Sequence, residues 1–234
     1  MKNITVCKNC GSENPFYSLI CSNCKAYLRT RIPNIDLWFT IGKVIESPIE
    51  AIKNIIYAEH KNFTIFLLIL SAIKIAINSL IINNAIKLKS IQNENILNAI
   101  LFTGVFFIIT FTVAIFFIYL INNLFHIKNR IKDNFSIYTY SLIPIIFALI
   151  ILTPVEYALF GHYWFTFNPS PFIIKTTESY ILIIIEVIFL LWSLILFIIS
   201  TYVQSKNIIY SFITGIILFI LIFISPFIFL YYFV

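Results

Sequence analysis

Charged residues are scarce in this sequence, and hydrophobic residues dominate it. Of the 234 residues only 11% are charged, whereas 60% are hydrophobic. A water-soluble globule of this size could not bury so much apolar surface in a single core. The composition therefore excludes a soluble domain as the main part of the chain, and it predicts that lipid surrounds most of the residues.

Glycine and histidine are also few, which removes most enzyme signatures. The chain has five glycines and contains neither a P-loop nor a GxSxG motif. The three histidines, His60, His126 and His162, stand in separate links or at span edges without metal-site spacing. We therefore predict that the protein is not an enzyme. A lipid-acting enzyme using Glu156, His162 or His126 stays open as the least favoured alternative.

The first 62 residues lack an apolar run long enough for the core of a signal peptide. They hold all four cysteines and eight of the sixteen Lys and Arg residues. We expect this part of the chain to stay in the compartment of synthesis. Reducing conditions there disfavour disulfides between the cysteines.

The rest of the chain contains five long apolar segments. Each is about the length, roughly 20 residues, that crosses about 30 Å of hydrocarbon as a helix. They cover residues 63–82, 96–121, 137–160, 180–203 and 208–233. Helices are expected because open strands cannot satisfy their backbone groups in lipid. The predicted fold is an all-α membrane protein, with a bundle of five transmembrane helices in residues 62–234.

The distribution of Lys and Arg predicts the orientation of these spans. With the N-terminus inside, twelve basic residues fall on the cytoplasmic side: eight before the first span, then Lys128, Arg130, Lys132 and Lys206. The opposite side receives Lys87, Lys89 and Lys175. The positive-inside rule therefore predicts a multi-pass protein of the cell membrane with a cytoplasmic N-terminus and an outer C-terminus.

Residues 33–61 are predicted to form an interfacial amphipathic helix or linker. Apolar residues recur there at spacings of three or four, which makes one apolar stripe: Trp38, Ile41, Ile45, Ile49, Ile52 and Ile56. Ser47, Pro48 and Glu50 have the pattern of a capping box, which predicts a helix start at Pro48. We expect the stripe to lie in the cytoplasmic interface of the membrane. Packing of this helix on the N-terminal head is the alternative.

The segment CKNCGSENPFYSLICSNC contains two CxxC pairs, Cys7 with Cys10 and Cys21 with Cys24. Two such pairs can give one ion a tetrahedral shell of four thiolates, and Gly11 suits the turn after the first pair. We predict a structural Zn²⁺ site in a small zinc ribbon over residues 1–32, because four thiolates leave no position for substrate. Iron in a rubredoxin-like site, or a redox dithiol, remains an alternative.

Basic residues give the head a charged edge formed by Lys8, Lys25, Arg29 and Arg31. Beside a membrane, such an edge favours contact with anionic lipid or with a cytoplasmic protein partner over nucleic acid. The sequence leaves open whether the chain forms a homo-oligomer.

Three charged residues, Lys74, Glu156 and Glu186, fall inside the predicted spans. Each costs on the order of 2.5 to 3.5 kcal/mol at membrane depth and therefore needs a partner or a function. Their depths suit an ion pair between Lys74 and Glu186, and Glu156 stands near enough to a span end to reach the interface. A bundle-fixing ion pair is favoured over a proton or ion path, because no second acid for a relay is evident.

The chain resembles the Yip family of Rab-GTPase-interacting membrane proteins, in its prokaryotic form with an N-terminal zinc ribbon. The likeness is carried by VIESPIEAIKNI, by YTYSLIPIIFALI with Tyr140 and Pro144, and by LLWSLILFIISTYVQSKN with Trp192. The resemblance implies a nonenzymatic five-helix protein with a role in membrane organisation or trafficking. The DLYGP-type motif of eukaryotic members is missing, so Rab binding is not carried over.

Two functions therefore compete. The favoured one is an integral membrane adaptor or scaffold whose zinc ribbon is a cytoplasmic interaction module. The other is a small ion, proton or solute transporter that uses Lys74 and Glu186 inside the bundle.

Overall fold

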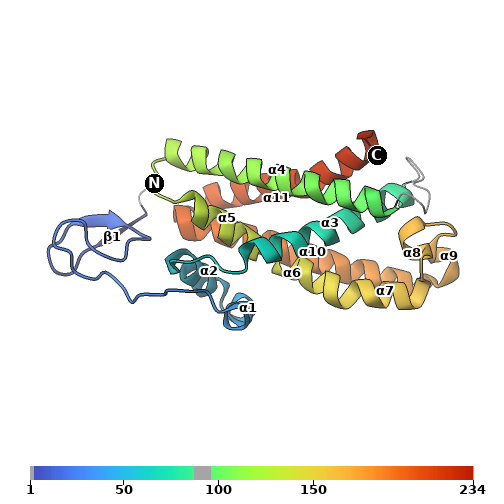
Figure 1. Cartoon of the computed structure of the whole chain (residues 1–234), viewed down its shortest axis with the longest axis horizontal. Helices are drawn as coiled ribbons and strands as arrows, with labels where there is room; N and C mark the ends of the chain where they lie inside the picture. Colours follow the sequence, from blue (N-terminus) through green and yellow to red (C-terminus); the bar gives the residue numbers. More distant parts are fainter. Residues whose placement is uncertain (1–2, 87–95, 234) are drawn as a thin grey trace. The chain divides into compact units, whose positions relative to one another are not determined.

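The structure is a computed structural model that describes residues 3–86 and 96–233, and Figure 1 labels its elements. Lys87 and Lys89, which enter the charge count for the outer side, lie outside the described residues. The described residues fall into two compact units, Met1–Ile65 with Val113–Ser141 and Leu196–Ile217, and Phe66–Thr112 with Leu142–Ile195 and Leu218–Val234. Four of the five boundaries between the units fall inside long helices, so these helices contribute residues to both units: α3 (Thr64–Ala85), α4 (Ile96–Leu124), α10 (Thr176–Ser205) and α11 (Ile208–Phe233).

Within the described residues, five helical segments are long and apolar enough to cross a membrane. They are α3 (Thr64–Ala85), α4 (Ile96–Leu124), the segment Ile143–Phe160, α10 (Thr176–Ser205) and α11 (Ile208–Phe233). Two short helices, α8 (Tyr163–Thr166) and α9 (Pro171–Ile174), lie between the third and fourth of these segments. The predicted fold class is confirmed: a five-helix membrane protein with a small four-cysteine region before it.

The third span is irregular, although the sequence predicts one helix over residues 137–160. The chain forms α5 (Ile131–Tyr140), α6 (Ile143–Phe147), the π-helix η2 (Ala148–Leu152) and α7 (Thr153–Phe160). Pro144 lacks an amide hydrogen and would clash with the carbonyl of Tyr140, where α5 ends. Pro154 follows the π turn, in which the amide of Thr153 reaches back five residues to the carbonyl of Ala148. The two prolines thus account for both irregularities.

The N-terminal head contains a short antiparallel sheet of β1 (Ile4–Val6) and β2 (Glu13–Pro15). A further antiparallel bridge joins Ile20 to Tyr27. Each pairing spans one CxxC turn, so the sheet and the bridge hold the two turns in place. The head has few buried apolar side chains to support this arrangement without a bound metal.

Two helices, α1 (Leu37–Glu46) and α2 (Pro48–Tyr57), connect the head to the first span. The new helix begins at Pro48 as predicted, but Ser47 forms no side-chain capping bond. The capping-box interpretation was wrong: the Ser47 hydroxyl accepts no helix amide, and the Ser47 amide, to which Glu50 would reach back, already donates to the carbonyl of Lys43 at the end of α1. The carboxylate of Glu50 instead binds Lys43 Nζ at 2.8 Å.

The expected single apolar stripe divides between these two helices. Trp38 and Ile45 of α1 and Ile49 of α2 are exposed, with Trp38 81% exposed. Ile52 and Ile56 of α2 are buried. The outward residues of α1 therefore suit a membrane interface, whereas most of the apolar face of α2 packs inside its own unit.

A polar network ties four helices together in the first unit. Gln204 of α10 donates to Asn134 of α5 at 2.6 Å, and Asn122 of α4 donates to Gln204 at 3.3 Å. The hydroxyl of Tyr210 in α11 donates to Asn122 at 2.6 Å. Asn122, Asn134 and Gln204 are buried, so these bonds replace the water that the side chains lose.

Gly215 of α11 permits close contact with α10 in the same unit. A Cβ added at Gly215 would lie 2.9 Å from Ile198 Cα, which is closer than the non-bonded contacts that Cβ atoms make in proteins. Small residues serve this purpose in membrane helices because they let two backbones approach.

We predict that Gly215→Ala destabilises the protein by about 1 to 3 kcal/mol, because α10 and α11 must move apart. Thermal unfolding in detergent measures the effect. The matched control is Gly104→Ala, whose new Cβ would meet the carbonyl oxygen of Ala72 at an ordinary 3.8 Å. Equal unfolding temperatures for the two variants would contradict the close contact.

Candidate functional site

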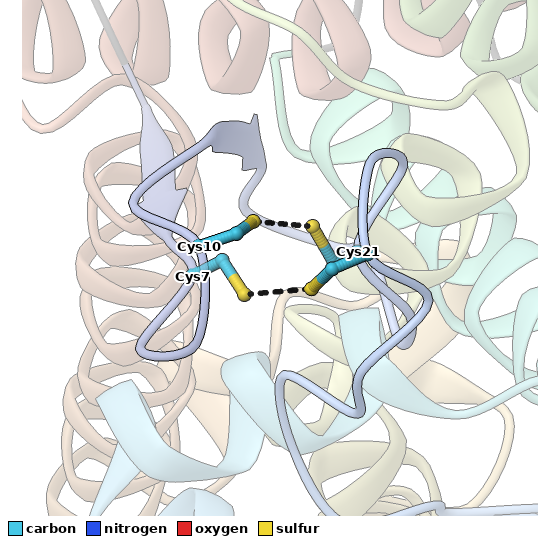
Figure 2. A group of neighbouring side chains, drawn as sticks. Cys7, Cys10 and Cys21 are labelled. Atoms are coloured by element: carbon cyan, nitrogen blue, oxygen red, sulfur yellow. Dashed lines mark hydrogen bonds between the residues drawn. The ribbon is translucent and has the colours of Figure 1, made fainter.

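The four cysteines converge on one point, as Figure 2 shows for Cys7, Cys10 and Cys21. The sulfurs of Cys7 and Cys24 are 3.6 Å apart, and those of Cys10 and Cys21 are 3.7 Å apart. All four sulfurs lie within 4.8 Å of one another. Metal–sulfur bonds of about 2.3 Å in a tetrahedron place sulfurs roughly 3.8 Å apart, so the four cysteines can hold a tetrahedral ion.

Both CxxC turns have the same backbone form. The residue after each pair, Gly11 or Lys25, has a positive φ of 72° or 60°. The amide of Gly11 donates to the carbonyl of Cys7 at 2.9 Å, and that of Lys25 donates to Cys21 at 3.2 Å. Glycine adopts this conformation freely, whereas lysine does so at a cost. The sequence pointed to Gly11, but it gave no signal that Lys25 takes the equivalent position.

Hydrogen bonds favour the thiolate forms that a metal needs. The Ser12 hydroxyl lies 3.0 Å from the sulfurs of both Cys10 and Cys21. The Ser12 hydroxyl and then the backbone amide of Cys24 lower the pKa of Cys21 to about 5. The Ser12 hydroxyl also lowers the pKa of Cys10. These two sulfurs are therefore ready ligands at neutral pH.

The head is fixed to helix ends within the first unit. The Asn3 side chain donates to the carbonyl of Gln204 at 2.6 Å, at the end of α10. Arg29 donates to the carbonyl of Tyr57 at 3.1 Å and stacks 4.4 Å above its ring. Arg130 lies 4.6 Å over the Tyr17 ring of the head. The metal turns are thus held on the first unit and are not a freely tethered module.

The basic edge expected on the head is only partly available to a partner. Arg29 makes the contacts with Tyr57, and Arg31 forms a two-pronged ion pair with Glu59 at 3.0 Å. Lys8 and Lys25 are exposed. Two of the four predicted cations, Arg29 and Arg31, are therefore engaged in contacts with other residues of the chain.

The second unit brings the three intramembrane charges into one cluster. Lys74 Nζ forms an ion pair with Glu186 Oε1, lies 3.7 Å from Glu156 Oε2, and donates to Thr153 Oγ1 at 3.1 Å. Asn78 Nδ2 donates to Glu186 Oε2 at 3.4 Å. Lys74 and Glu156 are fully buried. The sequence placed Lys74 opposite Glu186, and the structure adds Glu156 to that pair.

The sequence allowed Glu156 to reach the membrane interface, but in the structure it does not. The carboxylate follows the π turn and Pro154, which shift the register of α7 relative to a regular helix. Its side chain is 1% exposed and points toward Lys74. A uniform helix over residues 137–160 could not show this, because the register change comes from a single wider turn.

The three histidines join neither the cysteine cluster nor the charge cluster of the second unit. His60, His126 and His162 are exposed. Trp164 is 2% exposed and packs against Phe160, Leu152 and Leu182. The segment around Trp164 therefore forms part of the second unit's core.

Comparison of the chain with protein-family models, with curated proteins and with solved structures found no match.

We predict that the purified protein carries one bound metal ion per chain and that Cys21→Ser loses it. Loss of one thiolate opens the shell on which the fold of the head depends. Elemental analysis measures the metal, and limited proteolysis reports the unfolded head. Asn9→Ala, a change in the first turn that removes no sulfur, is the control. Full metal content in Cys21→Ser would contradict a four-thiolate site.

Proposed function

We propose that the protein is an integral membrane adaptor or scaffold whose metal-stabilised head binds a protein partner at the membrane surface. The observation that carries the proposal is an exposed pair on the head, Ile20 and Tyr27. The two residues face each other across an antiparallel bridge, and they are 43% and 74% exposed. A head with so little apolar material has no folding reason to leave both outside.

The surroundings of this pair support a role in recruitment. Lys25, also exposed, belongs to the same turn, so an apolar centre stands beside positive charge. Aromatic residues with a polar rim are typical of protein interfaces. The contacts of Asn3 and Arg29 hold the head in one position, so little ordering cost remains for binding. The expected partner presents an apolar pocket rimmed by acidic residues.

The rest of the proposal follows from the sequence. The motifs described above support membership of the Yip family and a nonenzymatic role. The distribution of basic residues supports a cytoplasmic head and a place in the cell membrane. Zinc is the proposed ion, because it prefers four-thiolate shells and has no redox chemistry of its own. The proposed role of the metal is structural: it shapes the turn that carries Ile20 and Tyr27.

The test is crosslinking in the native membrane from a photoreactive group at position 25. We expect one specific protein adduct, which is lost when Ile20→Ser and Tyr27→Ser are combined and also in Cys21→Ser. The control is Tyr232→Ser, which removes a tyrosine of α11 that is 70% exposed. The same adducts from the double variant, or no adduct from the wild type, would refute recruitment through this pair.

Transport of a proton or cation is the second candidate. It is favoured by the cluster itself, because Glu156 and Glu186 share the partner Lys74, so Glu156 is a second acid beside that pair and not an interfacial group. Buried ionisable groups inside membrane bundles commonly mark ion paths. This candidate differs from an adaptor in requiring flux, which reconstituted vesicles measure directly.

A further inference from the structure

The charge cluster borders a cavity in the second unit. The cavity has a volume of about 250 Å³, and its polar lining residues are Asn78, Glu156 and Glu186. The remaining walls are apolar or aromatic, including Trp164, Phe167 and Phe172. A mostly apolar pocket with a few converging polar groups is the usual form of a small-molecule site between helices.

The cluster carries more negative than positive charge. One ammonium, that of Lys74, faces two carboxylates, Glu156 and Glu186. Lys74 Nζ donates to Thr153 Oγ1 and pairs closely with Glu186, whereas Glu156 Oε2 lies 3.7 Å away, beyond hydrogen-bond distance. An uncompensated charge in such a place is costly, so the ionised cluster favours one additional positive charge.

Glu156 is the group left for a ligand. Its side chain is 1% exposed, and neither of its oxygens accepts a hydrogen bond from the residues that the structure describes. Trp164 Nε1 is likewise buried without an acceptor among those residues. Both side chains line the cavity. Unsatisfied buried polar groups of this kind call for a partner.

The remaining walls indicate what kind of cation fits. Aromatic faces attract cations with weakly hydrated, bulky heads, and more so when water is excluded. Three lining residues, Ile82 of α3 with Ile183 and Val187 of α10, are also exposed on the outer surface of these apolar helices. In a membrane these positions face hydrocarbon. A ligand that enters past them must be soluble in lipid.

We propose that this cavity binds a lipophilic monovalent organic cation, with the ammonium head beside Glu156 and the apolar part between the aromatic walls. The site does not depend on recruitment by the head. It gives the transport candidate a ligand class, but binding requires no flux, so the two can fail separately.

The test is calorimetric titration of the detergent-solubilised protein with benzyltrimethylammonium. Neopentylbenzene, which replaces the charged nitrogen with carbon at the same shape, is the neutral comparison. We expect the cation to bind more tightly than the neutral compound. Glu156→Gln should weaken the cation on the order of tenfold or more, because it balances the charge of the cluster, and should leave the neutral compound unchanged.

Two variants separate charge from shape. Glu178→Gln removes an exposed carboxylate of the same helix, α10, and should change nothing. Ile82→Trp, which fills the cavity from its rim, should weaken both compounds. The proposal is overturned if the wild type does not bind the cation, if Glu156→Gln binds it as well as the wild type, or if sodium displaces it at equal concentration. The last result would assign the site to an inorganic ion.

Discussion

The arrangement of this protein depends on pairing every buried polar group without water. In hydrocarbon an unpaired charge or amide costs several kcal/mol, so its partner must come from the chain or from a ligand. Lys74 meets this constraint most fully, since its ammonium contacts two carboxylates and one hydroxyl. Glu156 meets it least, because its only ionic partner within the described residues is that same lysine, 3.7 Å away. The charge imbalance arises because two carboxylates and one ammonium are buried together away from water.

The same constraint shapes the unit that carries the head. Gln204 forms side-chain hydrogen bonds with Asn122 and Asn134, which joins three helices. The backbone carbonyl of Gln204 also accepts a hydrogen bond from the side chain of Asn3. The head is therefore attached to helix ends through polar groups that would otherwise be unsatisfied. A metal site of four cysteines then fixes the turns that project from it. The head with its exposed pair, Ile20 and Tyr27, and the helix ends that hold it therefore form one continuous structure in this unit.

Much of this architecture could be predicted from the sequence, and the reasons are physical. Long apolar runs define spans, because length and composition decide membrane crossing. The two CxxC pairs define the metal centre, since spacing fixes the geometry of the thiolates. The place of Glu156 could not be predicted, because it depends on a π turn that no periodicity reveals. The stripe through α1 and α2 misled for a similar reason: the chain turns at Ser47, and the two helices then bury different faces.

The polar network and the cavity escaped prediction because both depend on contacts between distant segments. Asparagine and glutamine near span ends look like ordinary interfacial residues in a sequence. Trp164 and Phe172 belong to a link between two spans, but they line a cavity beside two acids. Only the fold brings these side chains together, so the sequence did not show that both acids share one lysine beside a cavity.

The central claim is that the buried cluster has one carboxylate too many and that a proton or a cation must neutralise it. Infrared spectroscopy of the carboxyl C=O stretch tests this directly. We predict that the ligand-free protein shows the band of one protonated, buried carboxyl, that the band is absent in Glu156→Gln, and that it disappears when the organic cation binds. A wild-type spectrum without this band, or a band unchanged in Glu156→Gln, would contradict the account.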